Sequence, residues 1–138
     1  MSISFTDVNW LALLVCVVLG QIFLTVWFAV IFAKPWASAY GVASPQEHTR
    51  AIPGYTYGLG AACVFLLSFG LQALQSRLQI SGIAGGVTLG VFVALFFAFS
   101  TALPGYAFLK RWRAFALAIG SQATLVVLLS TVLAVWPR

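Results

Sequence analysis

Four long stretches without a charged residue dominate the sequence, at residues 8–33, 51–76, 78–109 and 114–137. Each is longer than the roughly 20 apolar residues that an α-helix needs to cross about 30 Å of hydrocarbon. Hydrophobic residues make up 62% of the chain and charged residues 7%, against about 25% charged residues in a typical soluble domain. We therefore predict an all-α integral membrane four-helix bundle, a single domain over residues 1–138 with helices near 10–33, 52–75, 80–103 and 114–136. Because only Asp7 is charged ahead of the first span, we expect that span to be retained rather than cleaved as a signal peptide.

The basic residues are distributed unevenly between the two sides of this bundle. The first and third loops carry Lys34, Arg50, Lys110, Arg111 and Arg113, whereas the opposite side carries Arg77 and Arg138. Cytoplasmic loops of membrane proteins are enriched in Lys and Arg. We therefore predict that these two loops are cytoplasmic and that both termini lie on the non-cytoplasmic side.

Aromatic residues accompany the basic ones at the expected cytoplasmic interface. Tryptophan favours the boundary between hydrocarbon and water, and basic side chains are attracted to anionic lipid head groups. The predicted interface and head-group contacts are Lys34, Trp36, Lys110, Arg111, Trp112 and Arg113. In the first loop, Ser44, Pro45 and Glu47 match an N-cap, a proline at the first helical position and a capping-box acid, so we expect a short helix to begin at Pro45.

Small residues recur every four positions in the expected spans. The longest series is Gly82, Gly86, Gly90, Ala94 and Ala98, and a shorter one joins Gly54 and Gly58 to Ala62. Small residues allow helix backbones to approach closely in a membrane. Packing within one bundle is the favoured interpretation, and the interface of a homo-oligomer, such as a dimer, is the alternative.

Three glutamines are placed within the spans: Gln21, Gln72 and Gln122. A side-chain amide in hydrocarbon needs a hydrogen-bond partner. Gln21 and Gln122 fall at a similar depth, so we expect both to face the bundle interior as a candidate core polar pair. A structural role for this pair is favoured over a substrate contact, and Gln72 is expected near the outer surface.

Chemistry-bearing residues are scarce in the spans. The absence of an ionisable residue in mid-span argues against a proton-coupled exporter of the small multidrug-resistance type, and it removes the obvious general acid or base of an intramembrane enzyme. His48 has no second His or Cys near it in the sequence, and Cys16 and Cys63 lack a metal-ligand spacing. We predict no catalytic, cofactor-binding or metal-binding residues. The short basic cluster at a membrane interface also does not favour nucleic-acid binding.

Several short segments are shared with a known family. The segments "NWLALL", "WFAVIFAKPW" and "LPGYAFLKRW", with a last span ending at Trp136, resemble a family of small bacterial membrane proteins called domain of unknown function 1761. The resemblance covers essentially the whole chain. It implies a four-helix, multi-pass protein of the bacterial inner (cytoplasmic) membrane, and it transfers no catalytic or binding residues.

These observations favour a non-enzymatic membrane protein with a structural, accessory or lipid-associated role, whose partners are membrane lipids. The first alternative is a small transporter or channel for a neutral or weakly polar solute, lined by Gln21, Thr25, Ser121 and Gln122. The second is a membrane enzyme acting on a lipid or quinone, with a polar cluster drawn from Glu47, His48, Arg50 or Tyr57. A polar cavity around Gln21 and Gln122 would favour transport, whereas a closed core with paired amides would favour the structural role.

Overall fold

The computed structural model describes residues 8–137, and the regular secondary structure within that range is entirely helical. The elements are α1 (Trp10–Thr25), η2 (Val26–Ile31), α2 (Ala33–Ala39), α3 (Pro45–Ala51), α4 (Tyr55–Leu78), α5 (Gly82–Val93), η3 (Ala94–Phe99), α6 (Ser100–Phe108) and α7 (Trp112–Val135), where η marks a π-helical segment. Four continuous helical stretches of the described residues are long and apolar enough to cross a membrane: Trp10–Ile31, Tyr55–Leu78, Gly82–Phe108 and Trp112–Val135. The predicted four long apolar helices are confirmed as candidate spans.

The helix boundaries differ from the predicted ones at particular residues. The second span begins at Tyr55 because Ile52, which precedes Pro53, is extended with φ −74° and ψ 119°, and a proline disfavours the helical conformation of the residue before it. The third span continues through Pro104 as far as Phe108. The chain then turns at Lys110, whose φ is 54°, and α7 begins two residues later.

The predicted short helix of the first loop is present as α3. The Ser44 side chain accepts a hydrogen bond from the backbone N–H of Glu47 at 3.2 Å, and Pro45 occupies the first helical turn. This is the capping arrangement that the sequence indicated. The cap fixes Pro45 as the first residue of α3, the short helix that precedes α4.

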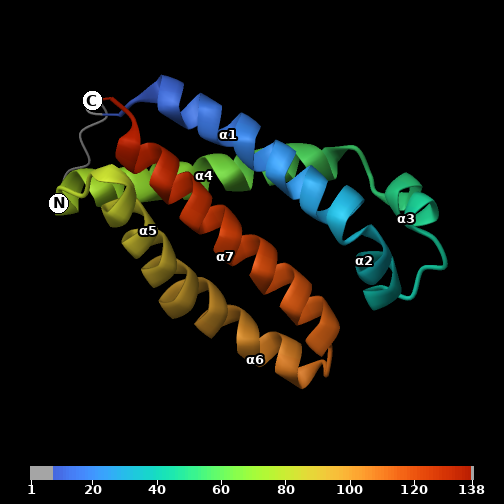
Figure 1. Ribbon diagram of the computed structural model, residues 1–138. Helices are drawn as coiled ribbons and strands as arrows, with labels where there is room; N and C mark the ends of the chain where they lie inside the picture. Colours follow the sequence, from blue (N-terminus) through green and yellow to red (C-terminus); the bar gives the residue numbers. More distant parts are fainter. Residues whose placement is uncertain (1–7, 138) are drawn as a thin grey trace.

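The start of α1 and the end of α7 lie together at one end of the bundle (Figure 1), where Asn9 Nδ2 donates to the carbonyl oxygen of Pro137 at 3.4 Å. We call this the terminal end. The opposite end carries α2, α3 and the turn between α6 and α7. We call it the basic end, because Lys34, Arg50, Lys110, Arg111 and Arg113 all belong to it.

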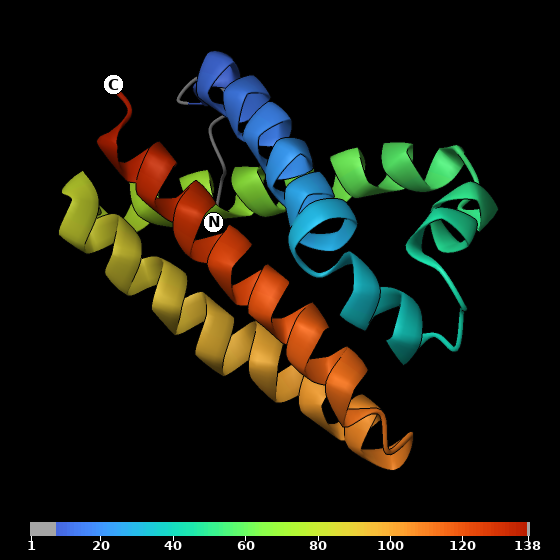
Figure 2. The same cartoon turned by 45° about the vertical axis from the view of Figure 1, so that its right-hand side comes forward.

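The closest helix contact joins α5 to α7, which run side by side in both views (Figures 1 and 2). A Cβ atom placed on Gly86 would lie 2.7 Å from the Cα of Thr131, and one placed on Gly90 would lie 2.6 Å from the Cα of Val127. These distances leave no room for a side chain. The long small-residue series therefore packs within one chain at Gly86 and Gly90.

Other members of the small-residue series make weaker contacts or none. Ala94 is buried and Ala98 is half-buried. A Cβ atom on Gly82, Gly54 or Gly58 would meet nothing within 4 Å. The short series at the start of α4 therefore does not pack the helices of this chain against each other.

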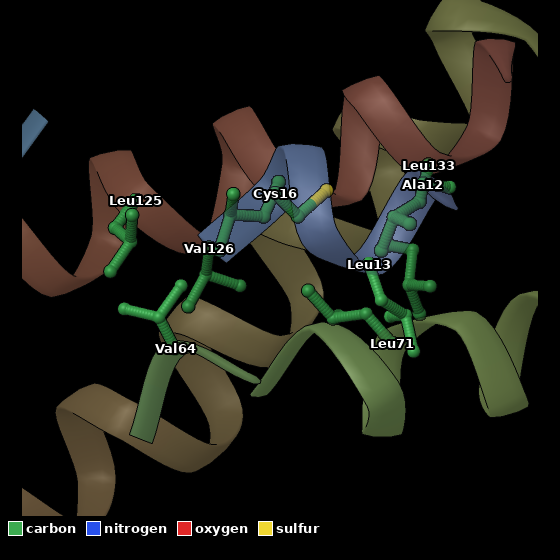
Figure 3. Close-up of a cluster of buried hydrophobic side chains, with 10 residues drawn as sticks. Ala12, Leu13, Cys16, Val64, Leu71, Leu125, Val126 and Leu133 are labelled. Atoms are coloured by element: carbon green, nitrogen blue, oxygen red, sulfur yellow. The ribbon is translucent and has the colours of Figure 1, made fainter. Parts of the chain in front are cut away.

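The apolar core lies towards the terminal end and is built mainly by α1, α4 and α7 (Figure 3), with Leu89 added from α5. Its buried members include Ala12, Leu13 and Cys16 of α1, Val64 and Leu71 of α4, and Leu125, Val126 and Leu133 of α7. In α4 the buried residues begin only at Val64, since none of residues 55–63 is buried. α4 crosses α7 obliquely, so the two helices separate towards the basic end (Figures 1 and 2).

A buried polar network joins α4, α5 and α7 beside this core. Gln75 Nε2 donates to the Ser130 carbonyl oxygen at 2.7 Å and to Ser130 Oγ at 3.2 Å, and Ser130 Oγ donates to the Gly86 carbonyl oxygen at 2.8 Å. Gln75 is 1% exposed and Ser130 is fully buried. Hydrogen bonds of this kind hold helices together in lipid, where apolar contact alone gives no preference over lipid.

Replacing Gly86 or Gly90 with leucine should lower the free energy of unfolding by more than about 2 kcal/mol, because the new side chain meets backbone atoms that cannot move aside. The matched control is Gly58→Leu, which adds the same side chain in open space. Thermal unfolding in detergent measures both effects. Equal melting temperatures for Gly86→Leu and Gly58→Leu would contradict the described α5–α7 contact.

Replacing Gln75 with leucine should destabilise the fold by about 1 kcal/mol, because the change removes two interhelical hydrogen bonds at nearly constant volume. Ser130→Ala, which also breaks the link to Gly86, should have a similar effect. Gln122→Leu is the control, since Gln122 is exposed and makes none of these bonds. Thermal unfolding in detergent measures these effects, and equal melting temperatures for Gln75→Leu and Gln122→Leu would show that the network does not stabilise the bundle.

Candidate functional site at the basic end

A cavity of about 230 Å³ lies between α1, η2, α2, α3 and α4 at the basic end. Its lining residues come from both arms that the first loop connects: Gln21, Leu24, Thr25, Phe28, Ala29, Ala33, Trp36, Pro45, Thr49, Ile52, Thr56, Tyr57 and Gly60. The cavity exists because α4 diverges from the rest of the bundle at this end and α2 and α3 cover the resulting space (Figure 1).

One wall of the cavity is aromatic and is shaped by the π-helical segment η2. The backbone N–H of Phe32 bonds to the carbonyl oxygen of Trp27, five residues earlier, at 2.9 Å. The wider turn places Phe28 and Ala29 on the cavity wall, where the Phe28 ring lies 4.3 Å from the Trp36 ring, centroid to centroid. Short π-helical segments within α-helices frequently occur at functional sites.

The polar groups of the cavity are an amide and several hydroxyls. The Nε2 atom of Gln21 is buried and has no hydrogen-bond partner. It lies against the backbone of α4, since a Cβ atom on Gly60 would be 3.3 Å from it. Thr25, Thr56 and Tyr57 also line the cavity. The cavity is therefore mainly apolar, with an unpaired amide at one side.

The predicted pair of Gln21 and Gln122 does not form. Gln122 is exposed on α7, and no hydrogen bond joins the two amides in the described structure. Residues seven positions apart share a helix face, and Phe115 and Leu129 on either side of Gln122 are both buried. Gln122 thus lies on the inward side of α7 at a level that the diverging α4 leaves uncovered. The prediction that Gln122 is buried is wrong. It relied on the depth of Gln122 along its span, and depth does not determine whether a neighbouring helix covers that residue.

The residues expected to line a solute path are also separated. Gln21 and Thr25 line the cavity, whereas the Ser121 hydroxyl is buried and donates to the Ala118 carbonyl oxygen of its own helix at 2.8 Å.

Gln72 is half-buried, and its Oε1 atom is buried without a partner, rather than wetted at the outer surface as expected.

Of the polar cluster considered for an enzyme, only Tyr57 lines the cavity among the side chains that the structure describes. Glu47 and Arg50 are exposed on α3. The side chain of His48 lies outside the described part of the chain. Among the side chains that the structure describes, His, Cys, Asp and Glu do not gather in a group of three or more that could hold a metal ion.

The predicted interface residues surround this end of the bundle. Lys34, Lys110, Arg111, Trp112 and Arg113 are exposed, and Trp36 is half-buried. Burial raises the pKa of the Tyr40 phenol, the neighbouring Tyr106 raises it further, and Arg111 partly offsets both. The end of α2 therefore lies beside the turn between α6 and α7, so the two basic loops are neighbours.

Two features of the structure were missed by sequence reasoning. Gln75 could have been found, because Val64, Ser68, Leu71 and Gln75 follow the spacing of one helix face. The cavity could not, because it depends on a widened turn within an apolar run and on how α2 and α3 fold back.

Comparison with known proteins gives one informative result. No curated protein and no solved structure matches the chain. The family described as "Protein of unknown function (DUF1761)" matches residues 11–134. That range includes nearly all of the four candidate spans. The chain therefore belongs to the DUF1761 family of proteins.

Proposed function

We propose that this chain is a non-enzymatic, lipid-associated accessory protein of the bacterial inner membrane, with the basic end in the cytoplasm and both termini outside. The supporting observation is the gathering of Lys34, Arg50, Lys110, Arg111 and Arg113 as exposed residues at one end. Such a surface is suited to the anionic head groups of the cytoplasmic leaflet, where each basic residue contributes about 1 kcal/mol of attraction.

Aromatic residues support the same placement. The rings of Trp36 and Tyr40 are in contact near the end of α2, with centroids 4.6 Å apart and planes tilted by 57°. Trp112 begins α7 beside the basic cluster. Amphipathic rings favour the layer between hydrocarbon and water. The basic end therefore carries both the charges and the rings that hold a protein end at a membrane surface.

The packing favours an accessory role over transport. The α5–α7 contact and the Gln75–Ser130 network close the terminal end, and the residues considered for a solute path lie apart. The cavity beside Gln21 is the feature that a transporter would use.

The orientation is tested by labelling single cysteines in intact cells. In a background with Cys16→Ala and Cys63→Ala, a membrane-impermeant maleimide should label Gln79→Cys from outside and should label Ala43→Cys only after the cells are opened. Both positions are exposed and lie outside the spans. The reverse pattern would refute the proposed orientation.

The contribution of the basic cluster is tested by charge removal. Replacing Lys110, Arg111 and Arg113 with glutamine should increase the fraction of inverted molecules in reporter fusions at the terminal end, because this change leaves a nearly even charge distribution. Arg77→Gln is the matched control, since it removes a charge from the opposite side and should reinforce the original orientation. An unchanged distribution in the triple variant would show that these charges do not set the topology.

A further inference from the structure

We propose that the cavity at the basic end binds the ring-shaped head group of a neutral, membrane-soluble amphiphile with carbonyl acceptors, the chemical class to which quinones belong. This site is distinct from the exposed basic surface that meets lipid head groups. The inference holds whichever side of the membrane the basic end faces.

The lining residues indicate an uncharged occupant. Among the described residues, no Lys, Arg, Asp or Glu lines the cavity. A charged group brought into such a space would lose its hydration without gaining a counter-charge, at a large free-energy cost. Phospholipid head groups, which carry a phosphate, are therefore suited to the exposed basic residues and not to the cavity.

The size and the walls indicate a flat ring. A volume of about 230 Å³ is below the range of about 300–1,000 Å³ that is usual for drug-sized ligands. The cavity therefore holds a head group while a hydrocarbon tail remains in the surrounding lipid. The tilted rings of Phe28 and Trp36, 4.3 Å apart, provide aromatic surface against which a ring can pack.

The unpaired amide indicates a hydrogen-bond acceptor on that ring. A buried donor without a partner costs about 1–3 kcal/mol, and Gln21 Nε2 is such a donor. Gln21 Nε2 lies beside Gly60 of α4, and both residues line the cavity. A carbonyl oxygen in the cavity then satisfies the amide, and the hydroxyls of Thr25, Thr56 and Tyr57 offer further donors. A lipid acyl chain would fill the space and leave the amide unpaired.

The binding experiment uses the full-length protein in nanodiscs of neutral phosphatidylcholine, with decylubiquinone as the probe and empty nanodiscs as the partition control. We expect saturable quenching of tryptophan fluorescence by the quinone. Gln21→Leu should weaken the apparent affinity about tenfold, the loss of one well-placed hydrogen bond. Gln122→Leu, which removes an exposed glutamine that does not line the cavity, should leave the affinity unchanged.

Two further measurements separate binding from folding. Gln21→Leu should melt at or above the wild-type temperature, because it removes an unpaired buried amide. Ala29→Phe adds a ring to the cavity wall and should abolish saturable quenching. If Gln21→Leu does not fold, this variant tests whether the quinone binds in the cavity. Excess decane should fail to displace the quinone.

The proposal is overturned by quenching that does not saturate, by equal affinities in the wild type and a folded Gln21→Leu protein, or by retained affinity in Ala29→Phe. Displacement by decane would also overturn it, since the cavity would then be a site for hydrocarbon chains. These outcomes do not affect the orientation or the head-group contacts of the basic end.

Discussion

Apolar helices in a bilayer gain nothing by leaving lipid for one another, because lipid tails are as apolar as leucine. The close approach of α5 to α7 at Gly86 and Gly90 therefore supports the rest of this bundle, since it brings two backbones into contact over surfaces that lipid cannot fill as well. The same approach places the Gly86 carbonyl oxygen within reach of Ser130, and Ser130 in turn binds Gln75 of α4. Packing and hydrogen bonding thus reinforce each other at one place, and α1 completes the core beside it (Figure 3).

Closing the terminal end leaves the basic end open, because α4 crosses α7 obliquely and diverges from it (Figure 2). The space that results is covered by α2 and α3 and walled by a π-helical turn. Polar groups at the two ends have different fates. Gln75 is paired and stabilises the fold, whereas the Nε2 atom of Gln21 is unpaired beside a cavity. Gln72 Oε1 is also buried without a partner, but Gln21 lines the cavity, where a ligand would supply the missing hydrogen bond.

The sequence predicted the spans and the α3 cap well, because uncharged length and capping residues act locally. It also placed Lys34, Arg50, Lys110, Arg111 and Arg113 together at one end of the bundle, where the structure has them. It failed for Gln122, whose surroundings depend on the crossing of α4 and α7, and it overlooked Gln75 although the spacing of the buried α4 face includes it. The two small-residue series have the same spacing, yet Gly86 and Gly90 of one pack on α7, whereas a Cβ on Gly54 or Gly58 of the other would meet nothing within 4 Å. Contacts between segments that are distant in the sequence decide which helix faces pack together, and a local sequence pattern does not predict those contacts.

The most direct test of a ligand site at the open end is the side-chain amide NMR signal of Gln21 in the full-length protein, assigned by its loss in Gln21→Leu. On addition of decylubiquinone, this signal should move downfield and saturate, while the corresponding signals of Gln75 and Gln122 stay in place. Gln75 is already paired, and Gln122 is not one of the residues that line the cavity. An unmoved Gln21 signal, or equal shifts of all three amides, would contradict the ligand site.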